Sequence, residues 1–378
     1  MNVFTDFHHS GLLQSLILLF EKRLGAKIYR PIGTDWHARG FWKVYDHPAT
    51  VEQFLGIGGN TPDGTQKLNE VIDERTPDKI ENYGAMWTGV YKCHDIDSGQ
   101  TNKAVTFDAF MRGKFDIVIA SLPAHVEPFK RLCKLHPSHP KLIYQIGNSW
   151  TSEAATAPNI MASAVIHNIP STVNFISYHQ EFSKDIFHPP VYHDPYGAAE
   201  LGLNDYDFDT LPDKNIYSFV NCFDVESNFK SDYQLFTQIE QSMPDWSFKI
   251  YGGQCRDGAI GPSAVLADMM RQARFIWHTK SGGDGYGHVI HNAPATGKPL
   301  IVKKQYYQGK MAESLLKDGE TCIVIDGLSP TEIIEKITYY SEPTRYKNMS
   351  KAAFDQFNNV VDFDAEQKKI EEFLSKLL

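Results

Sequence analysis

The chain has 378 residues, of which 42% are apolar and 22% are charged, and this composition is typical of a globular protein. Its net charge of −9 argues against a basic nucleic-acid-binding module. The longest apolar stretch, Leu12–Phe20, is interrupted by polar residues and falls short of the roughly 20 residues that a membrane helix needs. A single hydrophobic core rarely grows beyond about 250–300 residues, so the length predicts two domains.

The cysteines and the N-terminus predict a cytoplasmic location. The five cysteines are scattered and form no CxxC pair, which favours free thiols in a reducing compartment. The first residues carry acids and histidines where a secretory signal would carry Lys or Arg.

In the first half of the chain, strands and helices are expected to alternate, with an irregular, aromatic-rich region at 31–104. An amphipathic helix should follow the first strand, and a second helix is expected at Ala124–Lys134. The predicted strands are Asn2–Phe7, Lys27–Arg30, Phe115–Ser121, Lys141–Ile146 and Asn174–Tyr178.

The second half begins with an acidic connector at 194–214 that holds prolines and glycines. The strands expected after it are Ile216–Asn221, Ser247–Tyr251, Arg274–Thr279, Pro299–Val302 and Thr321–Ile325. The helices expected between and after them are Ser231–Ser242, Ser263–Gln272, one beginning near Tyr286, Met311–Lys317 and Pro330–Tyr340.

This alternation predicts an α/β protein made of two Rossmann-like, parallel-sheet domains that face each other across a cleft. We expect an N-terminal domain at 1–193, a linker at 194–214 and a C-terminal domain at 215–360. Residues 361–378 are expected to form a C-terminal helix that can pack back on the N-terminal domain.

The segment after the strand Arg274–Thr279 carries the strongest chemical signal. Glycines followed by a helix start form a natural anion site, because backbone N–H groups point at the ligand and glycine lets a diphosphate approach the main chain. Asp284 can accept hydrogen bonds from sugar hydroxyls, and Asn292 lies two turns further along the helix. The residues of this candidate site are Ser281, Gly282, Gly283, Asp284, Gly285, Tyr286, Gly287 and Asn292.

Asp284-Gly285-Tyr286-Gly287, followed by Ala293, Gly297 and Pro299, resembles the donor-binding signature of retaining GT-B glycosyltransferases of the family 4 type. The chain departs from this signature twice, since its first acid is Asp rather than Glu and Asn292 stands where the second acid should be. The opening Phe4–Gly11 is also similar to glycosyltransferases of phages and environmental bacteria.

The resemblance implies further donor-binding residues. It assigns a diphosphate-binding role to Lys230 and Lys280, and it places Asn221, Gly252 and Gly253 near the nucleotide. Asp284 and Lys230 are candidate catalytic residues, because they would orient the sugar and stabilise the leaving diphosphate. Either lysine can equally be a solvated surface residue.

The N-terminal half supplies the acceptor-side candidates. His9 is a candidate catalytic residue, either as a hydrogen-bond donor to phosphate or, in an inverting enzyme, as a general base, and Ser10 and Gly11 would face the donor phosphates. The simpler alternative is that one of the two loop histidines, His8 and His9, packs against the protein while the other is solvated. The remaining candidates for acceptor binding are His8, Trp36, Trp42, His94 and Asn148.

The resemblance implies a hexosyltransferase that moves a sugar from a nucleotide sugar, with UDP as the nucleotide, to a hydroxyl acceptor with retention. No metal or other cofactor is expected, and Asp95-Ile96-Asp97 is the one arguable metal-binding pair. The acceptor is a saccharide, a lipid-linked sugar, a protein or hydroxymethylated DNA. Two alternatives stay open: a phage-type DNA glycosyltransferase acting on 5-hydroxymethylpyrimidines, and a non-catalytic nucleotide-sugar-binding protein.

Overall fold

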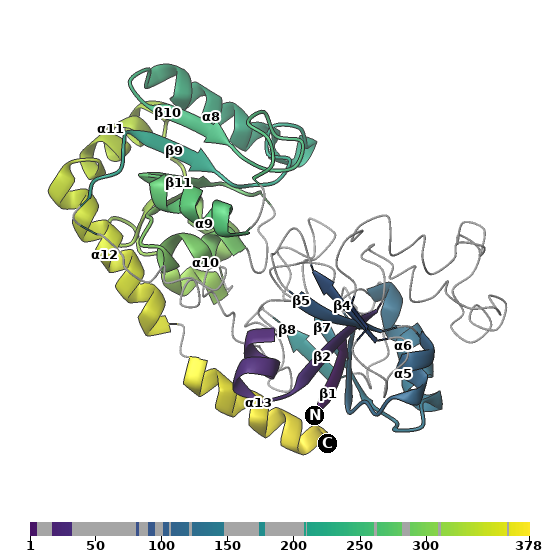
Figure 1. Cartoon of the computed structure of the whole chain (residues 1–378). Coiled ribbons are helices and arrows are strands. Elements are labelled where there is room, and N and C mark those ends of the chain that lie inside the picture. Colours follow the sequence, from purple (N-terminus) through teal and green to yellow (C-terminus); the bar gives the residue numbers. More distant parts are fainter. Residues whose placement is uncertain are drawn as a thin grey trace.

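Figure 1 shows the computed structural model of the whole chain. The structure describes residues 1–5, 17–31, 81–82, 90–94, 101–105, 107–120, 123–146, 174–177, 208, 210–260, 263–281, 288–308, 311–360 and 363–378. Two β-sheets organise these residues, one from each half of the chain.

The N-terminal sheet has the strand order β3-β4-β5-β2-β1-β6-β7-β8. Its central and C-terminal strands pair in parallel, whereas β4 pairs antiparallel with both β3 and β5. The strands are β1 (Asn2–Thr5), β2 (Lys27–Pro31), β3 (Glu81–Asn82), β4 (Val90–His94), β5 (Thr101–Val105), β6 (Ile117–Ala120), β7 (Lys141–Ile146) and β8 (Asn174–Ser177). The helical elements are η1 (Ile17–Arg23), a π-helix, α5 (Phe107–Arg112) and α6 (Pro123–Leu135).

The C-terminal sheet is parallel throughout and has the order β10-β9-β11-β12-β13. Its strands are β9 (Asn215–Ser218), β10 (Ser247–Ile250), β11 (Phe275–His278), β12 (Leu300–Val302) and β13 (Cys322–Val324). The α-helices are α8 (Lys230–Ser242), α9 (Ser263–Gln272), α10 (His288–Ala295), α11 (Pro330–Tyr340), α12 (Pro343–Val360) and α13 (Phe363–Leu377), and the short 3-10 helices are η2 (Ser227–Phe229), η3 (Lys304–Tyr307) and η4 (Met311–Leu315).

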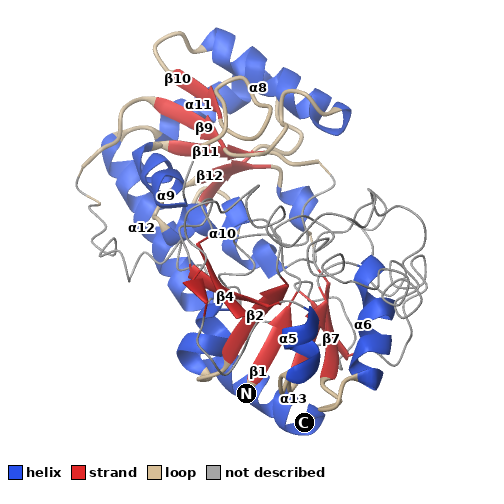
Figure 2. Ribbon diagram, turned by 45° about the vertical axis from the view of Figure 1, so that its right-hand side comes forward, coloured by secondary structure: helices blue, strands red, loops and turns tan. Residues whose placement is uncertain are grey.

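Alternation along the C-terminal strands builds a core on each face of this sheet. Phe275 and Trp277 of β11 are fully buried on the face covered by α8 and α11, whereas Ile276 is buried on the opposite face with Ile290 of α10. Helices therefore cover both sides of the sheet, as Figure 2 shows. Such a doubly covered parallel sheet leaves its carboxyl edge as the place for a ligand.

The last helix, α13, packs on the N-terminal sheet although it follows the C-terminal domain in the sequence. Its Ile370 and Leu374 are buried in one cluster with Val3 of β1 and Ile28 of β2. An ion pair between Arg23 Nη1 of η1 and Asp364 Oδ1, 2.7 Å long, adds a polar contact at the same boundary. The N- and C-terminal ends of the chain consequently lie beside the same sheet (Figure 1).

The predicted α/β fold is confirmed, and so are most of its elements, but the expectation of an irregular 31–104 region is wrong. Strands β3, β4 and β5 lie largely within it. They add an antiparallel edge, so the N-terminal sheet is mixed rather than purely parallel. Helix α12 was not expected from the sequence either. Among the described residues, no helix is both long and apolar enough to span a bilayer.

Candidate functional site

The carboxyl edge of the C-terminal sheet gathers the described donor-side candidates. Asn221 follows β9, and the pair Gly252 and Gly253, called the glycine pair below, follows β10. Lys280 and Ser281 follow β11. Because β9 pairs in parallel with both β10 and β11, these three loops leave the sheet side by side. The donor-side candidates predicted from the sequence therefore lie on neighbouring loops of the structure.

The glycine pair lies directly against Asn221. A Cβ atom on Gly252 would stand 2.9 Å from the Cα atom of Asn221 and 3.1 Å from its Oδ1. A Cβ atom on Gly253 would stand 3.0 Å from the same Oδ1. Glycine is required at position 252, because there the two loop backbones approach more closely than a side chain permits.

Backbone geometry and sulfur contacts lock the two loops together. Cys222 and Gln254 have φ values of 58° and 65°, which non-glycine residues adopt rarely. The Cys222 Sγ donates to the Gly253 carbonyl at 3.4 Å, and the buried Cys255 Sγ donates to the Val220 carbonyl at 3.6 Å. Burial and the nearby Glu226 carboxylate raise the pKa of the Cys222 thiol, so it stays protonated at neutral pH.

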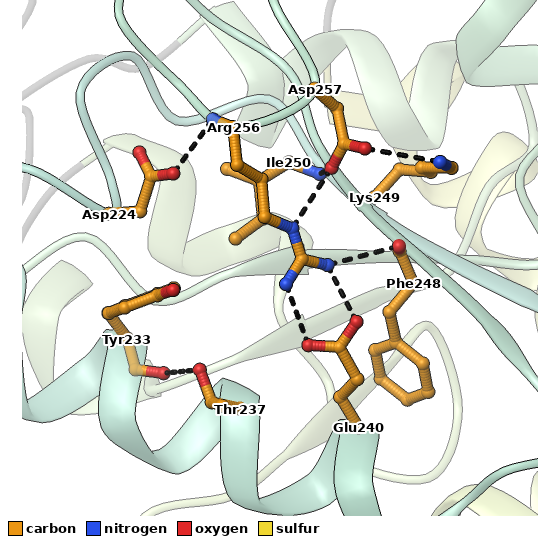
Figure 3. A network of polar contacts seen from close by, with 9 residues as sticks. All are labelled: Asp224, Tyr233, Thr237, Glu240, Phe248, Lys249, Ile250, Arg256 and Asp257. Carbon is orange, nitrogen blue, oxygen red and sulfur yellow. Dashed lines mark hydrogen bonds and ion pairs between the residues drawn. The ribbon is translucent and has the colours of Figure 1, made fainter.

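Arg256 anchors the glycine-containing loop to the rest of the domain, as Figure 3 shows. Its guanidinium binds both carboxylate oxygens of Glu240 in α8, at 2.7 and 2.8 Å, and donates to the Phe248 carbonyl at 3.1 Å. Its backbone N–H donates to Asp224 Oδ2 at 2.8 Å, which ties the loop after β10 to the loop after β9. Bidentate pairing of this kind fixes geometry as well as charge.

Asp257 completes this network. It accepts hydrogen bonds from the Ile250 N–H at 2.7 Å and from Lys249 Nζ at 3.1 Å. Burial alone would raise the pKa of Asp257, but these hydrogen bonds and the one from Arg256 outweigh burial and lower it. The carboxylate is therefore ionised at neutral pH and holds the start of the loop to β10.

The loop after β11 meets the loop after β9. Ser281 Oγ donates a hydrogen bond to the Asn228 carbonyl, two residues before Lys230. Lys230 is exposed and is the first residue of α8. The Lys280 ammonium lies near enough to Cys222 to act on the pKa of its thiol, which it lowers against the larger effects of burial and Glu226. Both lysines thus belong to this edge of the sheet.

Asn292 of α10 is buried, with 1% of its surface exposed. Its Oδ1 has no hydrogen-bond partner in the described part of the chain. A buried acceptor without a partner costs about 1–3 kcal/mol. A ligand hydroxyl or N–H group that reached this oxygen would recover that cost.

The other predicted site residues divide into two groups. His94 ends β4, and it pairs with Thr101 at the start of β5. Since β5 is parallel to β2, His94 lies at the amino-terminal edge of the parallel strands, opposite the edge where ligands bind, so its predicted acceptor role finds no support there. The predictions that lie outside the described residues are His8, His9, Ser10, Gly11, Trp36, Trp42, Asn148, Gly282, Gly283, Asp284, Gly285, Tyr286 and Gly287.

Sequence reasoning missed Arg256, Glu240, Asp232 and Lys303, whose side-chain contacts shape this edge. The available signal was weak: Arg256-Asp257 follows shortly after the glycine pair, and Lys303 directly follows a predicted strand. Within the described ranges, no group of three or more His, Cys, Asp or Glu side chains is arranged to hold a metal ion.

The two sheets, made mainly of parallel strands and covered by helices, define an α/β GT-B fold, and comparison with solved structures supports this class. The chain is similar to Anabaena HepE in complex with UDP-glucose, with 14% identity, a TM-score of 0.57 and coverage of 100% of this chain and 99% of that chain. It is also similar to a point mutant of S. aureus TarM in complex with fondaparinux, alpha-GlcNAc-glycerol and UDP, with 10% identity, a TM-score of 0.58 and coverage of 98% and 99%.

A third similar structure is the pneumococcal O-GlcNAc transferase GtfA in complex with UDP and GlcNAc, with 12% identity, a TM-score of 0.53 and coverage of 100% and 99%. No protein-family model matches the chain, and no curated protein matches it in sequence.

Proposed function

We propose that this protein is a glycosyltransferase that moves a sugar from a UDP-sugar to a hydroxyl acceptor with retention of configuration. The observation that carries the proposal is the meeting of three loops at the carboxyl edge of the C-terminal sheet, where Gly252 and Gly253 pack directly against Asn221. The GT-B fold supports it, and the similar structures of HepE, TarM and GtfA were obtained with UDP or UDP-glucose bound.

In this proposal, residues 215–360 bind the donor and residues 1–193 bind the acceptor, with 194–214 as the linker. Lys230 and Lys280 contribute positive charge to the leaving diphosphate, together with the backbone N–H groups of 282–287. Asp284 orients the donor sugar, and Asn292 Oδ1 accepts a hydrogen bond from the nucleoside part of the donor.

A transfer with retention requires correct positioning of donor and acceptor, and it does not require a side chain that acts as a base. The acceptor oxygen forms a bond to the anomeric carbon as the bond to the diphosphate breaks, and the leaving phosphate oxygen takes the acceptor proton on the same face. The protein contributes orientation of the two substrates and electrostatic stabilisation of the leaving group. No metal ion is required in this scheme, because the lysines and backbone N–H groups balance the diphosphate charge.

The acceptor belongs to the N-terminal domain, which would present His8, His9 and the aromatic residues Trp36 and Trp42. A saccharide acceptor is favoured, and hydroxymethylated DNA is the alternative that the same assay can detect. We place the protein in the cytoplasm, and the thiols of Cys133, Cys222, Cys255 and Cys322 are free, as expected in a reducing compartment.

A binding experiment tests the donor assignment. UDP at 100 times its dissociation constant should stabilise the fold by about 2.7 kcal/mol, measured as a thermal shift in the presence of EDTA. A shift that requires Mg²⁺ or Mn²⁺ would contradict the metal-independent proposal. ADP and GDP at equal concentration serve as controls for nucleotide selectivity.

An activity experiment tests catalysis. The chain should release UDP slowly from a UDP-sugar in water and faster with an acceptor, identified by mass measurement over a panel that includes oligosaccharides and hydroxymethylated DNA. Lys230→Ala and Asp284→Ala should each lower the rate more than about tenfold with little change in melting temperature. His9→Gln should keep substantial activity, and NMR of the product should show retention. Binding of the donor without release of UDP would favour the non-catalytic alternative.

A further inference from the structure

A buried charged cluster lies beside the proposed donor site and is not needed for the chemistry described above. Asp232 is completely buried, and its Oδ1 accepts a hydrogen bond from Lys303 Nζ at 2.5 Å. Its Oδ2 accepts a hydrogen bond from Tyr306 Oη at 3.1 Å. The Lys303 side chain is only 18% exposed. We call these three residues the Asp232 tether.

The tether joins two elements at the carboxyl edge of the C-terminal sheet. Asp232 lies in the first turn of α8, two residues after Lys230. Lys303 directly follows β12, whose last residue pairs with His278 of β11, so it leaves the sheet next to the strand that leads to Lys280. The tether therefore holds the start of α8 against the strands that carry the proposed phosphate-binding loop.

The start of α8 has few other polar attachments in the described part of the chain. Its N-cap residue Phe229 makes no side-chain capping bond, and Glu226, which precedes η2, makes none either. A missing cap typically costs about 1 kcal/mol of helix stability. The Asp232 tether therefore fixes this turn together with the buried Phe229 ring, the edge-to-face contact of Tyr233 with Phe223, and the Ser281 contact with Asn228.

The cost of burying these charges indicates a role beyond stability. The cost of removing two charges from water offsets most of the attraction between them, so replacing a buried ion pair with apolar residues of similar volume often leaves folding stability unchanged or raises it. Burial alone would lower the pKa of Lys303, but the hydrogen bond and charge of Asp232 outweigh it and raise the pKa. Lys303 is therefore charged, and its directional ion pair with Asp232 joins the first turn of α8 to the residue that follows β12.

We propose that Asp232 and Lys303 are positioning residues that hold the first turn of α8 so that Lys230 reaches the donor diphosphate. This inference rests on the proposed function, because it assigns the tether to the same donor site. The tether does not touch the substrate. It acts through Lys230, and loosening it should weaken binding of the β-phosphate more than binding of the nucleoside.

The test compares UDP with UMP, which lacks the β-phosphate. Removing one charge alone would leave the other buried without its partner, so the principal variant is the double change Asp232→Leu with Lys303→Met, which removes both charges. Its affinity for UDP, measured by calorimetry, should fall about tenfold, equivalent to about 1.4 kcal/mol, while its affinity for UMP changes little. Adding Lys230→Ala to this double variant should cause no further loss, although Lys230→Ala alone costs about tenfold.

Two further variants keep the test decisive. Tyr306→Phe removes one hydrogen bond to Asp232 with almost no change in volume, so it should fold and should lose UDP affinity about two- to threefold. The matched control is Lys351→Met with Asp355→Leu, which removes an exposed ion pair of α12 and the same charges, and it should bind UDP like the wild type.

The outcomes separate the two proposals. If the wild type binds UDP but the tether variants keep its affinity, and Lys230→Ala still costs tenfold in their background, the tether is only structural and the inference is overturned. If the wild type binds neither UDP nor UMP, the proposed function fails and the positioning role falls with it. Equal losses for UDP and UMP would also overturn the inference, because they would indicate a general disturbance of the site.

Discussion

Alanine in place of Gly252 should destabilise the protein, whereas alanine in place of Gly253 should not. An added Cβ atom on Gly252 meets the Cα atom of Asn221 at 2.9 Å and the buried Cys255 Sγ at 3.0 Å. Carbon atoms in contact prefer about 3.5–4.0 Å, so the backbone of one loop must move by several tenths of an ångström. Overpacking of this kind costs about 1–3 kcal/mol.

Gly253 contacts a side-chain atom of Asn221 rather than its backbone. Its added Cβ atom meets only Asn221 Oδ1 at 3.0 Å, and the next atoms of that side chain lie at 3.9 Å. Because Asn221 is exposed, its amide can rotate away, and the cost in stability should stay within about 0.5 kcal/mol. The displaced amide should still weaken UDP binding, since Asn221 lies in the proposed nucleotide site.

Urea denaturation measures the stability of both variants, and a thermal shift with UDP measures binding. Gly252→Ala should lower the melting temperature by roughly 2–4 °C for each kcal/mol lost. Gly253→Ala should melt like the wild type but show a smaller shift with UDP. Equal loss of stability in the two variants, or a larger loss for Gly253→Ala, would refute the argument from loop contact.

Three other predictions concern the same edge of the sheet. Arg256→Lys cannot bind both oxygens of Glu240, so it should lose about 1–2 kcal/mol in urea denaturation and some UDP affinity. The lowered pKa of Asp257 stabilises the fold at pH values above the pKa of this group in the unfolded chain, and this contribution is lost as the pH falls through the pKa of the folded state. Asp257→Asn should therefore have a lower free energy of unfolding than the wild type at pH 7, and an acid titration should show this difference shrinking as the pH falls. Asn292→Leu removes a buried acceptor that has no partner in the described part of the chain, so it should melt no lower than the wild type yet bind UDP more weakly.

The elements with strong local signals were predictable from the sequence. The bounds of β7, α9 and α11 agree with the predicted ranges, because apolar periodicity is clear there. For α11, Ser329 and Glu332 also form a capping box, with Pro330 in the first turn.

The missed elements have weak local signals for physical reasons. β4 and β5 carry polar residues within short runs such as Val90–His94, and tertiary pairing at the sheet edge decides their structure. The buried face of α12 includes the small residues Ser350 and Ala353, so its apolar stripe is thin. Long-range ion pairs cannot be read from spacing at all, since 71 residues separate Asp232 from Lys303.

The placement of Asn221, Gly252 and Gly253 on neighbouring loops was predictable, because parallel strands end at the same edge. Their direct contact was not, since it depends on the left-handed conformation of Cys222 and Gln254. Arg256 also escaped the sequence analysis, because its partner Glu240 lies on a different element, and only folding brings the two together.

The packing of α13 on the first sheet makes the C-terminal domain an insertion, in topological terms, within the domain that begins the chain. Ile370 and Leu374 complete a core whose other members, such as Val3 and Ile28, are synthesised first. That core stays open until α13 has been synthesised, so the N-terminal domain should finish folding only after the domain that follows it in the sequence.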